Sequence, residues 1–366
     1  MGRRRPSPFA SRSVIDWLTF TARLDHRIGD GGPFYAGEIM ATKPDPTHPD
    51  GFALDWSVWK RKSMEGSHSS VIQVQSTTDD EGRPAIWVSG NPAKWFQGHN
   101  IFGSEDLLGL CCEMLHRVCQ SVGVSPSAED RQAWAAGALK LTRVDVTHSF
   151  DLGTLPRVRN ALRSLDASAN LKHRGRGHFK GDSITFGKGS RRWSLTLYAK
   201  GAEIAVHKMA QDLAESSLTA YAQGLLRSEV RMLSLQLADE GLQWAASWGD
   251  NTASELHHRF MEGLQIAEAT MIDAPTLDDL PGRLQLAYQA WKTGSDLRAT
   301  LPRRTFYRYR TELLRHGVDI AVRQERTGPD LSNVVPLRTV LHAYPVGVPD
   351  WAAGTPLYFE PRAKFG

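Results

Sequence analysis

The chain has 366 residues, of which 41% are hydrophobic and 23% are charged, and its formal net charge is +4. These values are typical of a soluble globular protein with one large or two smaller domains, and so small a positive charge does not by itself establish a polyanionic partner. No apolar run reaches ~18 residues and none follows the N-terminal arginines, so we expect neither a transmembrane helix nor a secretory signal.

Alternating and apolar runs predict a series of strands near the start of the chain. They cover Val14–Phe20, Phe52–Lys60, Ser70–Ser76 and Pro84–Ser89. Residues 1–12 are expected to form a basic, disordered tail. The stretch 29–51 is rich in Gly, Pro and Asp, so we expect a loop with at most one short strand.

The segment Gly90–Gly103 combines turn residues with hydrogen-bond donors and two aromatic rings. The donors are Lys94, Gln97, His99 and Asn100, and the rings are Trp95 and Phe96. This mixture suits contact with a sugar-phosphate backbone and unstacked bases. A structured loop whose polar groups satisfy one another has the same composition, so both interpretations stay open.

Three cysteines lie in one predicted amphipathic helix that begins at Ser104. They are Cys111, Cys112 and Cys119. Their odd number and close spacing match neither a disulfide framework nor a zinc site, and they indicate a reducing cytoplasm. We expect this helix to pack on the apolar face of a sheet.

Three later segments alternate apolar and polar residues, as half-buried strands do. They are Leu141–Phe150, Trp193–Lys200 and Leu226–Met232, with Arg143, Asp145, Tyr198, Lys200, Arg227, Glu229 and Arg231 among the polar residues. If the strands join one sheet with their polar faces on the same side, these side chains converge on one surface. Two carboxylates, a tyrosine and several cations are the groups needed for metal-assisted attack on a phosphodiester.

Tyr198 and Lys200 are two residues apart on a predicted strand, which places a phenol beside an ammonium group. A nearby cation favours the phenolate, the form that a nucleophile needs. Taken alone, this strand is better explained as an ordinary strand with a solvated edge. The two other polar strands favour a catalytic role.

Cations are dense immediately upstream of Tyr198. A glycine-rich loop at Lys172–Lys180 and a hairpin at Ser183–Arg192 carry Arg174, Arg176, Lys188, Arg191 and Arg192. A solvated charge run is the usual explanation of such a pattern. Because the glycines allow close approach of the backbone, we favour contact with DNA.

The C-terminal third is mostly helical in pattern. Residues 240–299 look wholly helical, with breaks near 274–275 and 281–282. A basic-aromatic helix is predicted after Leu301-Pro302 and ends at Gly317; it fits either a DNA-recognition helix or an amphipathic packing helix. The segments 333–337 and 348–351 read as terminal strand and loop.

Several blocks of this sequence resemble a known family. They are Asn91–Lys94 with Gln97–Gly103, Arg143–Asp145, the strand with Tyr198 and Lys200, Arg227–Glu229, Pro302-Arg303, Asn333–Leu337 and Pro349–Trp351. In this order they are similar to the gene II replication initiators of filamentous bacteriophages, the phage/plasmid replication protein II/X family. The likeness spans nearly the whole chain, and the Gln97–Asn100 block is its most distinctive motif.

The resemblance implies a rolling-circle initiator in the cytoplasm of a bacterial host. Such a protein nicks the plus-strand origin of double-stranded replicative-form DNA and later rejoins the displaced strand. Tyr198 falls at the position of the nucleophile, which would form a 5′-phosphotyrosine and leave a free 3′-OH as primer. The implied partners are origin duplex, displaced single strand, host helicase and host polymerase, with an oligomer on the origin and no membrane.

The resemblance also implies a divalent metal. The motif of two histidines flanking one hydrophobic residue is absent, since His257 and His258 are adjacent and lie in a predicted helix. The family looks like the plasmid initiators that use carboxylates, which fits Asp145 and Glu229 as ligands of Mg²⁺ or Mn²⁺ but leaves the rest of the ligand set open. His148 is on the apolar side of its strand by parity and is left out of that set.

The resemblance gives the remaining residues supporting roles. Lys200 would lower the pKa of Tyr198 or neutralise phosphate charge, and Glu203 would orient Lys200 or complete the metal site. The segment from Lys94 to Asn100 would hold the opened strand, and Arg143 and Arg227 would contact DNA.

We therefore expect an α+β fold: a mainly antiparallel sheet with helices packed on one face, followed by a mostly helical C-terminal region. The expected parts are a nicking domain over 13–238, a helical segment over 239–300 and a DNA-binding or accessory region over 301–366. Two other functions remain open, a sequence-specific DNA-binding protein without catalysis and a metal-dependent nuclease that uses water.

Overall fold

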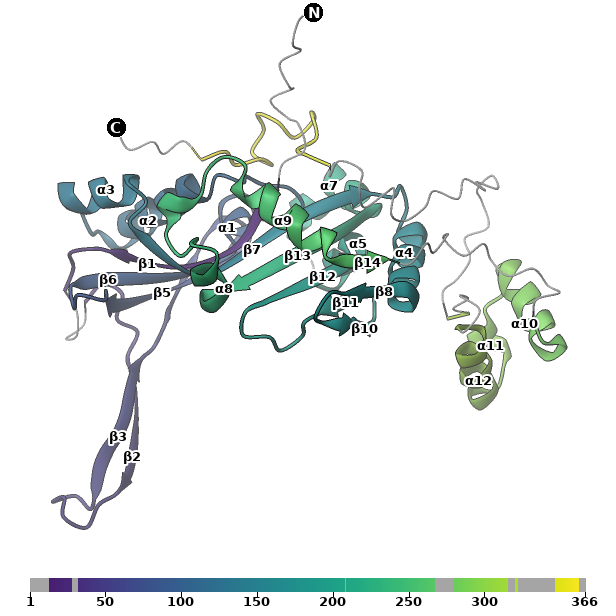
Figure 1. The fold of residues 1–366 in the computed structure, drawn as a ribbon, viewed down its shortest axis with the longest axis horizontal. Helices are drawn as coiled ribbons and strands as arrows, with labels where there is room; N and C mark the ends of the chain where they lie inside the picture. Colours follow the sequence, from purple (N-terminus) through teal and green to yellow (C-terminus); the bar gives the residue numbers. More distant parts are fainter. Residues whose placement is uncertain are drawn as a thin grey trace, which may run out of the picture.

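A nine-stranded antiparallel sheet forms the centre of the protein (Figure 1). The computed structural model describes residues 13–27, 32–207, 209–266, 280–314, 320–321 and 346–361. The strand order is β10-β11-β12-β13-β7-β1-β6-β5-β4, and every pair of neighbours is antiparallel. This arrangement confirms the predicted α+β fold.

Each strand predicted between residues 13 and 240 is present. The large sheet consists of β1 (Val14–Arg23), β4 (Lys62–Glu65), β5 (Val71–Thr78), β6 (Pro84–Gly90), β7 (Leu139–Asp151), β10 (His178–Lys180), β11 (Ser183–Phe186), β12 (Trp193–Ala199) and β13 (Leu225–Leu233). A small sheet joins β14 (Leu264–Ile266), β8 (Ala169–Leu171) and β9 (Gly175–Arg176).

Within the described residues, six helices contribute to one hydrophobic core with the apolar face of the large sheet. They are α1 (Pro92–Gln97), α2 (Leu107–Val122), α3 (Ala128–Ala135), α4 (Leu155–Ser168), α8 (Ser234–Asp239) and α9 (Thr252–Glu262). The other helices of this part are α5 (Lys200–His207), α6 (Gln211–Ala214) and α7 (Ser217–Ala222), with 3₁₀ turns at Ser67–Ser69 and Ala245–Ser247. Within the described ranges, no helix combines the length and the apolar character that a membrane span requires.

Helix α2 shows how local sequence sets its ends. Asp106 is its N-cap and accepts a hydrogen bond from the Gly109 amide at 2.9 Å, while Gly123 ends it in the left-handed conformation that glycine tolerates. The helix therefore begins three residues after Ser104, where the sequence predicts its start. Its three cysteines are free and buried, as an amphipathic packing helix requires.

The stretch 240–266 differs from its prediction as a wholly helical segment. It contains the 3₁₀ turn, helix α9 and strand β14. β14 forms because Leu264 and Ile266 pair with Leu171 and Ala169 of β8. Phe260 of α9 packs in the sheet's core, so this stretch belongs to the same folded body as the sheet.

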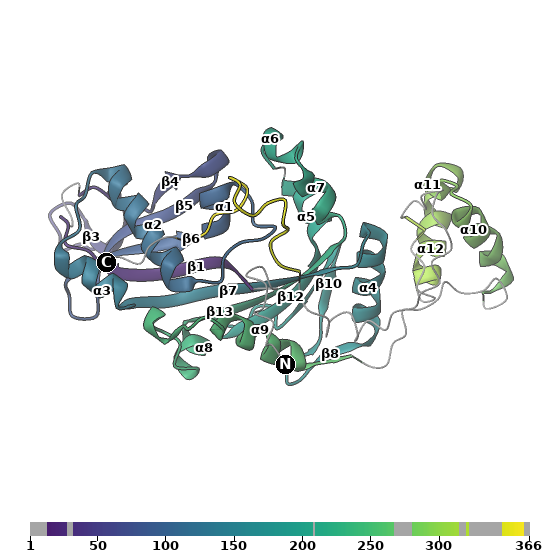
Figure 2. The ribbon, with the colours of Figure 1, turned by 90° about the horizontal axis from the view of Figure 1, so that it is seen from above.

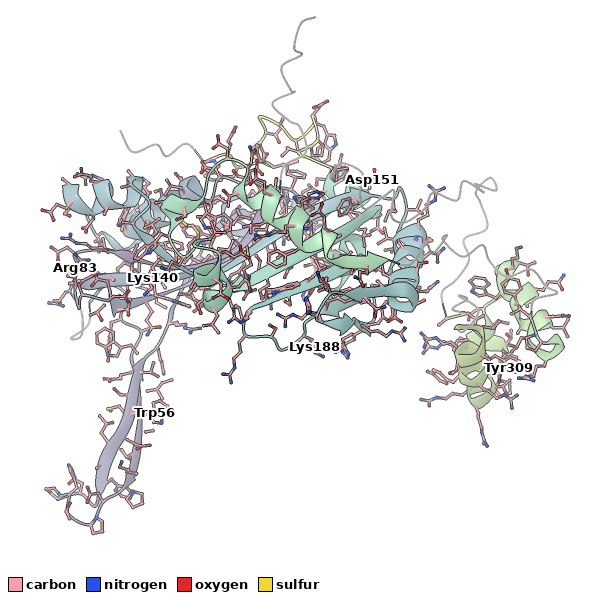
Figure 3. All side chains as sticks on the ribbon, in the orientation of Figure 1. Trp56, Arg83, Lys140, Asp151, Lys188 and Tyr309 are labelled. Atoms are coloured by element: carbon pink, nitrogen blue, oxygen red, sulfur yellow. The ribbon has the colours of Figure 1, made fainter. Side chains whose placement is uncertain are left out.

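Strands β2 (Glu38–Pro44) and β3 (Phe52–Trp59) form a hairpin that projects away from the sheet (Figure 1). Large apolar side chains on it are exposed, among them Met40, Leu54 and Trp56, and Trp56 is labelled in Figure 3. β2 is the one short strand expected in the stretch 29–51.

The described parts of the C-terminal third pack in two different places. Helices α10 (Gly282–Lys292), α11 (Leu297–Thr300) and α12 (Arg303–Leu314) have a core of their own. Residues 346–361 instead return to the sheet (Figure 2): Ala352 is buried with Phe102 and with Leu218 of α7. The three-helix unit thus spans the expected boundary at residue 300. The predicted basic tail at 1–12, the predicted helix end at Gly317 and the predicted terminal segment 333–337 lie outside the described residues.

Candidate active site

Strands β12, β13 and β7 lie side by side, and their polar residues meet on one face. Tyr198 pairs with Arg227, which pairs with Ser149. Glu229 lies two residues after Arg227 on β13 and points to the same face. Arg231 lies two residues further on, and it pairs with Asp145 of β7. Because side chains alternate across a strand, all of these groups share one surface. The convergence expected from the three strand patterns is therefore present.

Tyr198 presents an unengaged hydroxyl to this surface. Its side chain is half-buried, and no group within the described ranges hydrogen-bonds the phenolic oxygen. Burial raises the pKa of the Tyr198 phenol well above its usual range, and the carboxylates of Glu229, Asp16 and Glu203 raise it further. The main opposing effect comes from the Arg227 guanidinium. The expectation of a lowered Tyr198 pKa is therefore wrong: the phenol is neutral at rest.

Lys200 is not on the strand, because β12 ends at Ala199 and Lys200 begins α5. Its side chain is fully buried, and Nζ donates to Asn100 Oδ1 at 2.7 Å and to Glu203 Oε2 at 2.6 Å. The same Nζ lies 6.0 Å from the centre of the Tyr198 ring. Burial, and then the charge of Arg227, lower the pKa of Lys200 to about 8. Glu203 orients Lys200, as one of its two expected roles requires.

Asp16 is a buried carboxylate that sequence reasoning missed. Its Oδ1 accepts from Asn91 Nδ2 at 3.1 Å and from Asn100 Nδ2 at 2.7 Å, and it lies 3.8 Å from Arg227 Nη1. A register shift in the β1–β7 pairing between Ile15 and Trp17 places it here. The signal available in the sequence was a single acid inside the apolar run of the first predicted strand.

Arg227 is fully buried and connects three segments of the site through hydrogen bonds. Its Nε donates to Ser149 Oγ at 3.1 Å, and its two terminal nitrogens donate to the backbone carbonyls of Asn100 and Ile101. The guanidinium thus ties β13 to β7 and to the chain that follows α1. Because the whole side chain is buried, the expectation that Arg227 binds DNA does not match its position.

The two expected metal ligands are joined by one guanidinium. Arg231 Nε lies 3.2 Å from Asp145 Oδ2, and its Nη2 lies 3.2 Å from Glu229 Oε1. Arg143 also donates to Asp145, at 2.9 Å and 2.5 Å, and its guanidinium lies 4.6 Å from the centre of the Trp17 ring. Burial, then Asp145 and Asp16, raise the pKa of Glu229, since crowded carboxylates repel one another.

These carboxylates have the chemistry of a magnesium site but lack a preformed cage. In the part of the chain that the structure describes, no group of three or more His, Cys, Asp or Glu side chains is arranged to hold a metal ion. Mg²⁺ is commonly held by only one or two carboxylates, with substrate phosphates and waters completing its shell. Asp145 and Glu229 fit that pattern, and the Arg231 side chain that bridges them is 42% exposed.

The segment after β6 is a helix with a tight turn and not a DNA-contacting loop. Asn91 caps α1 by accepting from the Lys94 amide, and Gly98 ends it with a φ of 83°. Gln97 donates to the carbonyls of His99 and Phe102, and its oxygen accepts from the Phe359 amide. The polar groups here satisfy one another, which was the second interpretation of this composition.

Burial removes most of this segment from any DNA surface. Gln97, His99 and Asn100 are at most 5% exposed, and the Trp95 and Phe96 rings are buried. His99 bonds the Leu357 carbonyl, and burial lowers its pKa to about 4. Only Lys94 reaches outward: its side chain is 39% exposed, with Nζ 3.7 Å from Glu203 Oε1.

The basic residues upstream of Tyr198 do not surround it. The Arg174 guanidinium lies 4.9 Å from the ring centre of Trp193, on the helical side of the sheet, and Arg176 donates to the Asp166 carbonyl of α4. Lys188, Arg191 and Arg192 are exposed in the turn between β11 and β12, where Figure 3 labels Lys188. At ~3.3 Å per residue, that turn is about 17 Å or more from Tyr198 along β12.

His148 points away from this face, as parity predicts. It lies under α9, where its ring stacks on His257 at 3.7 Å and bonds the Ser13 hydroxyl. His257 in turn bonds Ser228 Oγ at 2.7 Å. These two histidines join α9 to β13 and β7. Because each ring bonds a serine hydroxyl on the core side of the sheet, neither faces the carboxylates as a metal ligand.

Comparison with known protein families accounts for nearly the whole chain. Residues 14–251 match the family model described as the N-terminal part of replication-associated protein G2P, and residues 279–361 match its C-terminal part. The chain belongs to the G2P family. The N-terminal match contains every residue of the polar face described above, and the C-terminal match contains α10 to α12 and residues 346–361.

Relatives of this G2P chain occur in enterobacterial phages. It is 33% identical over 342 residues to the replication-associated protein G2P of Enterobacteria phage I2-2, covering 92% of this chain and 95% of the relative. It is 25% identical over 255 residues to the G2P of Enterobacteria phage M13, covering 63% and 55% of the two chains. Among solved structures, a rolling circle replication initiator protein from Geobacillus stearothermophilus aligns with 12% identity and a TM-score of 0.32, over 72% of this chain and 89% of that one.

Proposed function

We propose that this G2P chain initiates rolling-circle replication by nicking origin DNA with Tyr198 as nucleophile. The observation that carries the proposal is the unengaged Tyr198 hydroxyl on a face with Asp145, Glu229 and an arginine network. A neutral tyrosine on a rigid strand beside carboxylates suits phosphoryl transfer, in which positioning and electrostatic stabilisation do most of the work.

In the proposed reaction the Tyr198 oxygen attacks the scissile phosphorus. A tyrosyl–phosphate bond forms at the 5′ side and the bond to the 3′ oxygen breaks, while the phenol loses its proton and the 3′ oxygen gains one. The covalent link conserves the phosphodiester's energy, so the reverse attack by a 3′-OH rejoins the strand without a nucleotide cofactor.

Several residues support this chemistry. Asp145 and Glu229 are the proposed holders of Mg²⁺ or Mn²⁺, which would polarise the phosphate and offset its developing charge. Lys94, the partly buried Arg143 and the more exposed Arg231 are the proposed contacts to the DNA backbone. Lys200 sets the position of Asn100 and adds positive charge near Tyr198. Host helicase and polymerase are the proposed users of the opened duplex and the 3′-OH.

The decisive experiment incubates purified full-length protein with supercoiled plasmid carrying the candidate origin, in Mg²⁺ or in EDTA, followed by denaturing electrophoresis. We expect a Mg²⁺-dependent nick with protein attached to the 5′ end, absent in Tyr198→Phe. A nick without attached protein would identify a nuclease that uses water. Specific binding with no nick would identify a DNA-binding protein without catalysis.

A further inference from the structure

Helices α10, α11 and α12 form a separate small unit beside the sheet domain. Their core contains Leu284, Tyr288, Trp291, Phe306 and Leu313, none of which belongs to the core of the sheet. Figures 1 and 2 both show the unit standing away from the nine-stranded sheet, and Figure 3 labels Tyr309 on it. A unit with its own core is able to carry a binding function of its own.

The positive charge of the chain is concentrated in this unit. Residues 280–314 contain seven Lys and Arg against two Asp and Glu, a net charge of +5, whereas the entire chain carries +4. Everything outside these 35 residues therefore sums to −1. A basic cluster of this density on one small unit is the electrostatic footprint of a polyanion partner.

The two acids of the unit are already engaged. Glu312 pairs with Arg283 at 2.7 Å, and Asp296 caps α11 by accepting from the Arg298 amide at 3.0 Å. Within the described ranges no carboxylate pairs with Arg303, Arg304 or Arg308. These three exposed arginines therefore have no neutralising carboxylate within the described ranges.

The charge order along α12 opposes the helix dipole. Arg303 and Arg304 occupy its first turn, where a helix disfavours cations, and Glu312 lies near its C-terminal end, where a helix disfavours anions. Helix stability does not explain this arrangement, but a bound anion near the N-terminal turn does, because it gains from both the arginines and the dipole.

The exposed face of α12 has the shape of a groove-reading surface. Arg304, Arg308 and Thr311 are exposed at helical spacing, with Tyr307 39% exposed beside them, while Phe306 and Leu313 are buried on the other side. The short α11 leads through Leu301-Pro302 into α12, the order in which a helix-turn-helix presents its recognition helix.

We propose that α12 docks in the major groove of duplex DNA and reads bases there through Arg304 and Arg308. A convex, arginine-bearing helix fits that groove, and arginine pairs bidentately with guanine edges. The proposal goes beyond the nicking site, since it gives the chain a second DNA site that anchors intact duplex while the sheet works on the opened strand. It rests on the proposed function only for calling that duplex the origin.

The test measures duplex binding by full-length protein in EDTA, where no cleavage intervenes. A duplex enriched from a random pool by the wild-type protein is compared, by fluorescence anisotropy, with a scrambled duplex of the same composition. We expect Arg304→Ala/Arg308→Ala to weaken binding of the enriched duplex at least about tenfold and to reduce the slope of log affinity against log salt by about 2. Arg83→Ala/Arg131→Ala, an equal charge loss at the far end of the sheet, is expected to change affinity less than about twofold.

Further variants and a nicking control distinguish base recognition from effects on folding and catalysis. Arg304→Lys/Arg308→Lys keeps the charge but not the planar fork, so the preference for the enriched duplex should fall while the salt slope stays. Nicking of a single-stranded oligonucleotide in Mg²⁺ should be unchanged in these variants, which also shows that they fold. Full retention of duplex affinity by the alanine variant, or an equal loss of single-strand binding, overturns the proposal. Nicking by Tyr198→Phe would instead overturn the proposed function and leave this test intact.

Discussion

Tyr198 and Arg227 are direct cross-strand partners on β12 and β13, and the Arg227 guanidinium gives the main effect that opposes the raised pKa of the Tyr198 phenol. The arginine is buried and hydrogen-bonds Ser149 and two backbone carbonyls, and its effect on the phenol is that of its charge and not of a hydrogen bond. The Tyr198 phenol is therefore protonated in the free protein, and the proposed attack would require the incoming phosphate and metal to make it reactive.

Replacing Arg227 should be costly even when charge is kept. Arg227→Lys loses the planar fork that reaches Ser149 and the carbonyls of Asn100 and Ile101, and it leaves Asp16 with a weaker counter-charge. We expect a loss of about 3–5 kcal/mol in the free energy of unfolding, because buried polar groups lose their partners. Urea unfolding followed by circular dichroism measures it.

Arg231→Lys is the matched control for that measurement. Arg231 lies four residues after Arg227 on the same face of β13, but its side chain is 42% exposed, so its ion pairs should contribute less than about 1 kcal/mol. Equal losses in the two variants would show that Arg227 is not the buried tie that its contacts indicate.

Lys200 and Glu203 should behave as a coupled pair. Lys200→Met removes a buried ammonium that bonds both Glu203 and Asn100, and Glu203→Gln removes its charged partner. Each single change should cost about 1–3 kcal/mol of stability. The double variant should cost less than the sum by about 1 kcal/mol or more, since the groups share one contact. Lys94 Nζ lies 3.7 Å from Glu203 Oε1, and the Lys94 side chain is 39% exposed. A double-mutant cycle between Lys94→Ala and Glu203→Gln should therefore give a coupling energy below about 0.5 kcal/mol.

The polar face could be predicted from sequence because strand parity is local information. Alternation in three segments placed Asp145, Tyr198 and Glu229 on one side, and the antiparallel order β12-β13-β7 puts all three on one face of the sheet. Lys200 broke the rule, since the strand ends one residue before it, and element boundaries depend on tertiary contacts that alternation does not encode.

The remaining features depend on long-range contacts. Gln97 and His99 look like surface donors in sequence, but their partners are Phe359 and Leu357, more than 250 residues away. Asp16 is linked to Arg227 only through the fold. The charge of a side chain predicts its chemistry, whereas its burial depends on segments that composition does not place beside it.

The two stacked histidines on the opposite face predict an acid-sensitive fold. Burial lowers the pKa of His148 to about 4 and that of His257 well below its ordinary value. Below pH ~6.5 the unfolded chain binds protons that the folded chain does not, so stability should fall by about 1.4 kcal/mol per pH unit for each histidine, down to the folded-state pKa. Urea midpoints measured from pH 7 to pH 4.5 test this.

His257→Gln should flatten that pH profile, because glutamine can keep a bond to Ser228 but does not titrate. His178→Gln, at an exposed position on β10, should leave the profile as in wild type. A profile that is identical in wild type and His257→Gln would assign the acid sensitivity to other groups.

Affinity for Mg²⁺ should rise when Arg231 is replaced and fall when Asp145 or Glu229 is replaced. Arg231 lies 3.2 Å from both carboxylates, so it competes with a divalent ion for them. Arg231→Met should therefore lower the Mg²⁺ concentration for half-maximal nicking of a single-stranded oligonucleotide by about threefold, as loss of a partly exposed ion pair allows. Asp145→Asn and Glu229→Gln should raise it by at least about tenfold. Direct Mn²⁺ binding by electron paramagnetic resonance separates metal affinity from DNA affinity, and unchanged Mn²⁺ binding in all three variants would rule out these carboxylates as the ligands.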